Sequence, residues 1–300
     1  MRKLEYCANG NNKKYVLITA AHNEESNVEK TIVSVANQSI KPLRWVIVDD
    51  RSSDATESIL REYQHGSDFV EILKVTGDSS RNFGAQVAAI NRGYESIKSL
   101  DYDYIGNLDA DLSFEANYFE ELLSAFQSNP SLGLTGGEIC EQSGGEFRPR
   151  KFNNDNSVPH AVQMFSRPCF DCIGGYKPLK YGGPDWYAEV MARLQGWDVQ
   201  TTKGLYVYHH RPTSGAENVV TGAVRAGFMA YSLGSHPLFE IMKAVARLQQ
   251  KPYIVYSLIK LSAYFWSVST GRNREASDDF VKYLRTEQLL RIKRLFAIKH

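Results

Sequence analysis

Short apolar runs alternate with amphipathic segments along the first part of the chain. The runs at residues 14–20, 44–50, 69–75 and 104–108 are nearly continuously apolar, which is typical of strands buried on both faces of a sheet. The segments between them place apolar residues at helical spacing, most clearly over 82–99. This alternation predicts βαβ units, and therefore an α/β fold with a Rossmann-like, mostly parallel sheet flanked by helices.

The pattern becomes less regular after residue 111. Helices are predicted over 115–128 and 184–195, and strands over 132–139 and 198–208. Two stretches rich in Gly and polar residues, 141–160 and 211–222, are predicted to be a mobile loop and a linker. The chain is then expected to be helical to its end. We therefore expect an α/β domain over 1–211, with halves at about 14–111 and 112–211, and a helical C-terminal extension over 212–300.

Composition changes this picture mainly through the distribution of charge. The formal net charge is +1, which gives no argument for a nucleic-acid partner. Residues 241–300, however, hold twelve Lys and Arg against four Asp and Glu, a net +8, which leaves −7 for the first 240 residues. Four cysteines do not form a disulfide framework, residues 1–6 do not begin a signal peptide, and no stretch is a confident membrane span, so a cytoplasmic location is expected.

Two carboxylates follow the apolar run 104–108 with one residue between them. Asp109 and Asp111 would lie at the carboxyl end of a buried strand, where open α/β sheets bind ligands. A divalent cation would relieve their mutual repulsion, and Mg²⁺ or Mn²⁺ prefers oxygen ligands. The alternative is an acidic turn before a helix that Ser113 caps.

Polar residues also follow the neighbouring predicted strands. Asp50 could accept a hydrogen bond from a nucleobase N–H, with Glu24 and the backbone at Ala20 beside it, although Asp49 and Asp50 could equally cap their own loop. Further on, Gly84 at a helix start would allow phosphate to approach backbone N–H groups, and Arg81 could neutralise a diphosphate.

Taken in order, these pieces resemble the family 2 glycosyltransferases of the GT-A fold over roughly residues 14–210. The segments that carry the resemblance are Thr19-Ala-Ala-His-Asn-Glu-Glu, Val46-Ile-Val-Asp-Asp-Arg-Ser-Ser-Asp-Ala-Thr56, Arg81-Asn-Phe-Gly with Asn91-Arg-Gly93, and Asp109-Ala-Asp111. The resemblance implies a nucleotide-sugar donor, a divalent cation (Mn²⁺ or Mg²⁺) and inversion at the anomeric carbon. It makes 14–111 the nucleotide-sugar half and 112–211 the acceptor half.

The resemblance also implies a role for individual residues of the donor site. Asp50 matches the residue that reads the base, with Ala20 and Glu24 beside it. Asp109 matches the first acid of the D-x-D motif, near the ribose and the metal, and Asp111 matches the metal ligand on the diphosphate.

Inversion requires a base, which the family places at a helix N-terminus after a Gly-rich acceptor loop. Gly174 and Gly175 fall in that loop, and Asp185 takes the position of the base. The chain has Pro-Asp where the family often has Glu-Asp, so Glu189, one turn later, is a reserve candidate; alternatively, Asp185 only caps its helix. His209 or His210 would complete the metal site, and the two are not distinguished by sequence.

The basic, aromatic tail has two interpretations. Residues 238–300 could contact a membrane peripherally and bring the active site to a lipid-linked acceptor. They could instead bury their apolar faces on the first domain or on a second subunit. Lys260 in the middle of 252–270 argues against a membrane span.

These features predict an inverting glycosyltransferase that moves a sugar from a nucleoside-diphosphate sugar, UDP favoured over GDP, to a hydroxyl. The acceptor would be a glycan or a lipid-linked molecule of bacterial-type cell-surface polysaccharide or glycolipid assembly, at the inner face of the plasma membrane. A non-catalytic sugar- or partner-binding module on this scaffold is the alternative. A sugar nucleotidyltransferase is less favoured, because the loop after the first strand contains no glycine.

Overall fold

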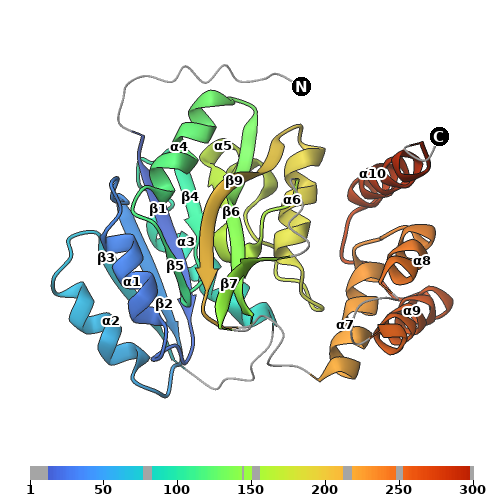
Figure 1. Ribbon diagram of the computed structural model, residues 1–300, viewed down its shortest axis with the longest axis horizontal. Helices are drawn as coiled ribbons and strands as arrows, with labels where there is room; N and C mark the ends of the chain where they lie inside the picture. The colour runs from blue at the N-terminus through green and yellow to red at the C-terminus, as the bar shows by residue number, and fades with distance from the viewer. Residues whose placement is uncertain are drawn as a thin grey trace.

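The computed structural model describes residues 13–76, 83–143, 145–150, 156–211, 218–247 and 253–297. A nine-stranded sheet forms its centre, with strand order β3-β2-β1-β4-β8-β6-β9-β5 and β7 paired to β6 (Figure 1). The strands are β1 (Tyr15–Ala21), β2 (Arg44–Asp50), β3 (Val70–Val75), β4 (Tyr104–Asn107), β5 (Leu112–Phe114), β6 (Leu132–Ser143), β7 (Glu146–Pro149), β8 (Met164–Ser166) and β9 (Asp198–His209).

The helices alternate with these strands and then follow them. They are α1 (Val28–Ala36), α2 (Thr56–Gln64), α3 (Phe83–Ile97), α4 (Tyr118–Ser128), α5 (Arg167–Ile173), α6 (Pro184–Leu194), α7 (Val219–Ser232), α8 (Pro237–Ala246), α9 (Tyr253–Ser269) and α10 (Asp278–Ala297), with a short 3-10 turn at His160–Val162.

The first half of the fold has the predicted architecture. Strands β3, β2, β1 and β4 are all parallel. The side chains of β1, β2 and β4 are largely buried because helices cover both faces, whereas β3, at the edge of the sheet, is mostly half-buried. Figure 1 shows α1 in front of this part of the sheet and α3 behind it. Parallel strands bring the chain after β1, β2 and β4 to the same edge, which is where the acidic residues lie.

The second half is a mixed sheet, and it departs from the sequence prediction in several segments. Strand β6 is parallel to β9 but antiparallel to β8 and β7. Residues 141–160 were expected to be a mobile loop, but β6 continues to Ser143 and pairs with β7 in a hairpin. The prediction was wrong for the strands of this hairpin, because Gly and charged residues suit a solvent-exposed hairpin as well as a loop. Residues 151–155 of the predicted loop lie outside the described residues. The three-residue strands β5 and β8 are too short to show a period in the sequence.

The last four helices confirm the predicted helical C-terminal segment. Helix α7 begins at Val219, so the predicted linker is shorter than residues 211–222, and residues 212–217 lie outside the described part. Leu179, Tyr187 and Val190 share a hydrophobic cluster with Leu233 and Phe280, which joins α6 to the C-terminal helices. In the described part of the chain, no helix is long and apolar enough to cross a membrane.

Candidate active site at the carboxyl edge of the sheet

The Asp-x-Asp segment connects β4 to β5, and strand pairing places it beside the end of β9. Asp109 and Asp111 follow β4, and the next residue, Leu112, pairs with His209 across the antiparallel β5–β9 ladder. His209 Nε2 lies 3.1 Å from Asp111 Oδ1. One ligand atom from each of Asp109, Asp111 and His209 lies within 4.8 Å of the others. The two carboxylates suit Mn²⁺ or Mg²⁺, whereas imidazole suits Mn²⁺ less well than a carboxylate does.

The alternation of side chains along a strand distinguishes the two histidines. His209 is buried and directed to Asp111, whereas His210 packs edge-on to Phe147 and its Nε2 lies 2.8 Å from Ser113 Oγ. Ser113 itself lies in β5, so the alternative in which it caps a helix after an acidic turn is wrong. Of the two candidates, His209 is therefore the one that faces the acidic pair.

Arg211 adds a positive charge to this group of acids. Its Nε lies 3.2 Å from Asp111 Oδ2, and its Nη2 donates to Glu24 Oε1, so the guanidinium bridges the residues after β1 and β4. The side chain is 46% exposed, whereas the carboxylates of Glu24 and Asp111 are almost fully buried. An exposed cation on two buried acids can exchange partners when other charged groups arrive.

The environment shifts the proton affinities of these groups. Burial raises the pKa of Glu24 to about 7, although Arg211 opposes the rise. Burial alone would also raise the pKa of Asp109, but His160, His209 and Arg211 together lower it, and His160 contributes most to the lowering. In turn, burial would lower the pKa of His160, and Asp109, at 3.7 Å between Nδ1 and Oδ1, raises it instead. Asp109 and His160 thus hold each other in their charged forms.

The remaining predicted donor residues lie along the same edge. Ala20 is half-buried near the end of β1, opposite Val48 of β2, and Asp50 ends β2 with its Oδ1 2.7 Å from Arg51 Nη2. Gly84 lies in the first turn of α3. Arg81 lies outside the described residues.

Asp185 lies in the first turn of α6, and a glycine with a positive φ precedes that turn. Gly183 has a φ of +82°, and a Cβ there would lie 2.8 Å from the Met229 sulfur of α7. Only glycine fits both requirements, and Pro184 then begins the helix with a fixed φ. The negative charge of Asp185 contributes to the raised pKa of both His160 and Tyr176, so Asp185 shares the electrostatic environment of Asp109.

The reserve candidate, Glu189, is engaged elsewhere. Its Oε1 accepts hydrogen bonds from the Val158 backbone at 2.7 Å and from the Ser157 hydroxyl at 3.0 Å. The side chain is buried, and burial raises its pKa to about 8. These contacts hold the segment before the 3-10 turn in place, so Glu189 has a structural role. Of the two carboxylates, Asp185 is the more accessible.

The predicted acceptor loop lies beside polar residues that the sequence analysis did not identify. Gly174 and Gly175 both have positive φ and end α5, as expected of a tight loop. Beyond them, Gln163 is buried and accepts a 2.6 Å hydrogen bond from Tyr176, while donating to the Val158 carbonyl. Gln163 and His160 were not predicted, because isolated polar residues in an irregular segment give no periodic signal.

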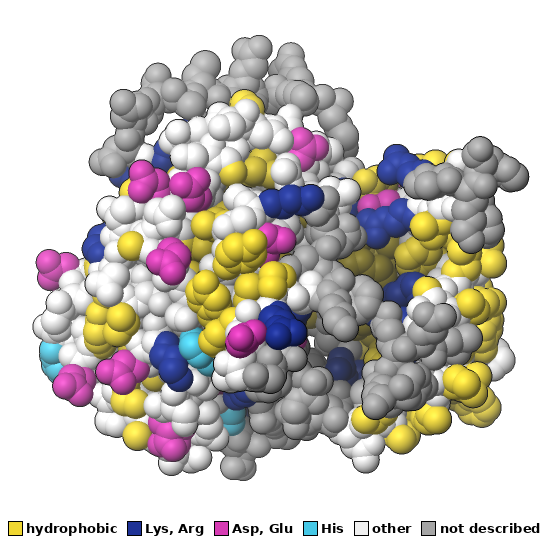
Figure 2. All heavy atoms as spheres, in the orientation of Figure 1, with side chains coloured by type: hydrophobic (Ala, Val, Ile, Leu, Met, Phe, Trp, Pro, Cys, Tyr) yellow, Lys and Arg dark blue, Asp and Glu magenta, His cyan; other side chains and the backbone are white. Residues whose placement is uncertain are grey.

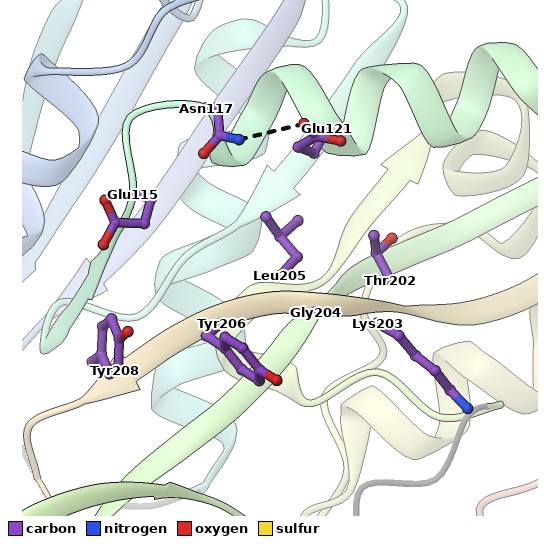
Figure 3. A pocket seen from close by; sticks show the side chains of 9 residues that line it. All are labelled: Glu115, Asn117, Glu121, Thr202, Lys203, Gly204, Leu205, Tyr206 and Tyr208. Atoms are coloured by element: carbon purple, nitrogen blue, oxygen red, sulfur yellow. Dashed lines mark hydrogen bonds between the residues drawn. The ribbon is translucent and has the colours of Figure 1, made fainter.

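A separate hollow of about 340 Å³ lies on the other face of β9 (Figure 3). Its wall includes Tyr206, Tyr208 and Lys203 of β9, with Glu115 and Glu121 opposite them. Because His209 points to the opposite side of this strand from Tyr208, the hollow is distinct from the acidic cluster.

The fold and the site define a GT-A-type glycosyltransferase architecture. Over 93% of this chain and 80% of its own, the fold matches a mannosyltransferase from Pyrobaculum calidifontis in complex with GDP-Man and Mn²⁺, with a TM-score of 0.59 and 17% identity. It also matches S. aureus TarS 1–349 in complex with UDP-GlcNAc, over 84% of this chain and 71% of that one, with a TM-score of 0.54 and 13% identity.

The sequence gives the more specific assignment. The profile of Glycosyl transferase family 2 matches residues 16–182, and the chain belongs to that family. A poly-β-1,6-N-acetyl-D-glucosamine synthase of Staphylococcus epidermidis is 31% identical over 120 residues, which are 40% of this chain and 27% of that protein. The synthase of Staphylococcus aureus is 28% identical over the same length. The match thus spans about a quarter of these relatives.

Proposed function

We propose that this protein is an inverting, metal-dependent glycosyltransferase that moves a sugar from a nucleoside-diphosphate sugar to a hydroxyl group. The observation that carries the proposal is the meeting of Asp109, Asp111 and His209 within 4.8 Å at the carboxyl edge of the sheet. The family assignment supports the same activity.

The donor site would extend along the three strand ends. Asp50 would accept a hydrogen bond from the base, and Ala20 and Glu24 would line the pocket beside it. Asp109, Asp111 and His209 would hold Mn²⁺ or Mg²⁺, which when bound supplies charge neutralisation for the departing diphosphate. Arg211 contacts Asp111 and Glu24, and nearly half of its side chain is exposed. Its guanidinium would therefore also be able to donate hydrogen bonds to a phosphate of the donor.

Asp185 would act as the base on the acceptor side. It would take the proton from the acceptor hydroxyl as the oxygen attacks the anomeric carbon in line with the leaving group. Gly174 and Gly175 would allow the acceptor to approach the backbone. Gln163 and Tyr176, hydrogen-bonded to each other at 2.6 Å, would fix the floor beneath this region.

The donor and the acceptor are proposed only by class. UDP is favoured over GDP, because the sequence relatives are synthases of an N-acetylglucosamine polymer and one structural relative was solved with UDP-GlcNAc. The mannosyltransferase relative, solved with GDP-Man, keeps GDP as the competing choice. Cell-surface polysaccharide or glycolipid assembly, at the cytoplasmic face of a membrane, is the corresponding role.

Two carboxyl-to-amide variants test the assignment of the base. Asp185→Asn should abolish sugar transfer while leaving donor binding intact, because the carboxylate contributes to chemistry and not to the nucleotide site. Glu189→Gln keeps an oxygen for the Val158 and Ser157 hydrogen bonds and should retain transfer. Normal turnover by Asp185→Asn, measured as release of the nucleoside diphosphate, would show that another group is the base.

Calorimetric titration with UDP and with GDP, each with and without Mn²⁺, tests the donor. We expect metal-dependent binding of UDP in preference to GDP. Binding of neither nucleotide under any of these conditions would favour a non-catalytic module built on the same scaffold.

A further inference from the structure

Helix α9 places polar side chains on its buried face and large apolar side chains on its exposed face. The buried face carries Ser257, Lys260 and Ser267 beside Ala263 and Tyr264. The exposed large side chains are all apolar, with exposed fractions of 41–59%; five lie on the opposite face and Val268 lies near the end of the helix: Ile254, Val255, Leu258, Phe265, Trp266 and Val268. A helix of a soluble domain normally directs its apolar stripe towards the core, so the exposed apolar face of α9 indicates an interaction site.

Helix α8 repeats this arrangement on a smaller scale. Leu238, Ile241 and Val245 share one face and are 40–61% exposed, while Glu240 on the opposite face is 1% exposed. Glu240 Oε2 accepts a 2.5 Å hydrogen bond from Lys260 Nζ, so a buried ion pair holds α8 to α9.

Close packing on α7 fixes the same orientation of α9. A Cβ at Gly227 of α7 would lie 2.3 Å from the Lys260 carbonyl and 2.7 Å from the Ala263 methyl. The polar side of α9 is therefore held inward by α7 and α8, and its apolar side faces outward as a consequence of the fold.

The exposed charges of α8, of α9 and of the turn after α9 all have one sign. In residues 237–274 the single acid is Glu240, which is buried, whereas Lys243, Arg247, Arg272 and Arg274 are partly or fully exposed cations. Figure 2 shows hydrophobic side chains gathered along the right side of the molecule, over the C-terminal helices, with Lys and Arg side chains beside them. A second copy of the chain would bring like charges together across a two-fold interface, whereas an anionic lipid surface complements them.

We propose that the exposed apolar face of α8 and α9 inserts into the interface of an anionic lipid bilayer, with the surrounding cations contacting lipid phosphates. The face would lie in the plane of the membrane and would not span it. Membrane binding itself does not depend on the proposed function. Its consequence does: the acceptor would be attached to lipid and would reach the active site from the bilayer surface.

Sedimentation with lipid vesicles tests the proposal on the full chain without any nucleotide sugar. We expect the protein to bind vesicles containing phosphatidylglycerol, to bind phosphatidylcholine vesicles more weakly, and to be released from the anionic vesicles by salt. Because no donor is present, a failure of sugar transfer would not alter this result, and a failure here would not alter the assignment of the active site.

Matched variants make the test specific to the surface. The double variant Val255→Ser/Trp266→Ser should weaken vesicle binding by roughly tenfold or more, because two exposed apolar side chains are lost. Arg247→Gln should reduce the dependence on anionic lipid. Val33→Ser, at an exposed valine of α1 in the first domain, should bind as the wild type does. Circular dichroism checks that each variant is folded.

Three results would overturn the proposal. The first is a wild-type chain that does not sediment with anionic vesicles. The second is a folded double variant that sediments as well as the wild type. The third is a wild-type dimer in light scattering that the double variant converts to a monomer, which would assign the face to a second copy of this chain.

Discussion

His209 and His210 are adjacent in the chain but lie in different surroundings. His209 is directed to Asp111, and Asp111 raises its pKa against the effect of burial, which lowers it. His210 contacts Ser113 and Phe147, and burial lowers its pKa. A one-residue step along β9 thus separates a candidate metal ligand from a residue that packs beside the sheet.

The two histidines therefore form a matched pair for a metal-binding test. His209→Ala should lose most of the affinity for Mn²⁺, because one of the three candidate ligands is removed. His210→Ala should keep Mn²⁺ affinity and lose only about 1 kcal/mol of stability with its hydrogen bond to Ser113. Calorimetric titration with Mn²⁺ measures the metal affinity of each variant, and chemical denaturation measures its stability. Equal loss in the two variants would contradict the assignment.

Glu189 predicts a pH dependence of stability. Its pKa rises from 4.5 to about 8 on folding, so the native state holds a proton that the unfolded state releases over that range. The unfolding free energy should therefore fall as the pH rises from 4.5 to 8. Glu189→Gln should be less sensitive to pH in this window, as measured by thermal unfolding at a series of pH values. An unchanged slope would show that Glu189 does not carry the effect, and that Glu24, with a pKa raised to about 7, is the next source to examine.

At the scale of elements, helix packing determines the direction in which α9 faces. Gly227 lets α7 approach the α9 backbone, and this contact keeps Lys260 in reach of Glu240. The sequence interpretation used Lys260 as an argument against a membrane span. In the structure this charge is satisfied internally, and α9 presents its apolar side outward.

Substitution of Gly227 tests this packing. Gly227→Ala should destabilise the protein by about 1–3 kcal/mol, since the added methyl overlaps the Lys260 carbonyl, despite the better helix propensity of alanine. Thr221→Ala, at an exposed position of the same helix, is the control and should be neutral or slightly stabilising. Chemical denaturation of the two variants measures the difference. A stabilised Gly227→Ala would mean that α7 and α9 are not in close contact.

At the scale of the whole molecule, the C-terminal helices support the candidate base. The Tyr187 ring of α6 stacks on Phe280 of α10 with centroids 4.7 Å apart, and Arg193 Nε lies 3.1 Å from Glu287 Oε1. The Lys177 ammonium also donates to the Glu275 carbonyl. Because α6 begins with Pro184 and Asp185, this interface connects the orientation of the base to the C-terminal part of the chain.

The interface predicts an effect on catalysis from a distant residue. Phe280→Ala should reduce stability by about 3–5 kcal/mol, because a fully buried ring is removed. It should lower the rate of transfer more than it weakens donor binding, since α6 carries the proposed base and the strand ends carry the proposed donor site. Steady-state kinetics at a temperature where the variant is folded, together with nucleotide titration, separates these effects. Loss of donor binding with an unchanged rate constant would contradict this assignment.

The parallel strands of the first half of the sheet can be derived from the sequence alone. Strand β2 lies at Arg44–Asp50 as predicted, β1 is shifted by one residue from its predicted range, and β4 ends one residue earlier than predicted. These predictions succeed because buried parallel strands are continuous apolar runs. The acids after these strands could be placed at one edge because parallel strands end together. The Asp-x-Asp segment, the family and the position of Asp185 at a helix start also followed from local order along the chain.

The contacts between segments far apart in the chain could be found only in the folded structure. The choice of His209 depended on the β5–β9 register, the role of Glu189 on the loop at Val158, and the outward face of α9 on its packing against α7 and α8. Each of these joins residues that are far apart in the chain or in different elements. Their relation is set by packing and by the pairing of polar groups in the folded state, and hydrophobic periodicity within one segment carries no information about it.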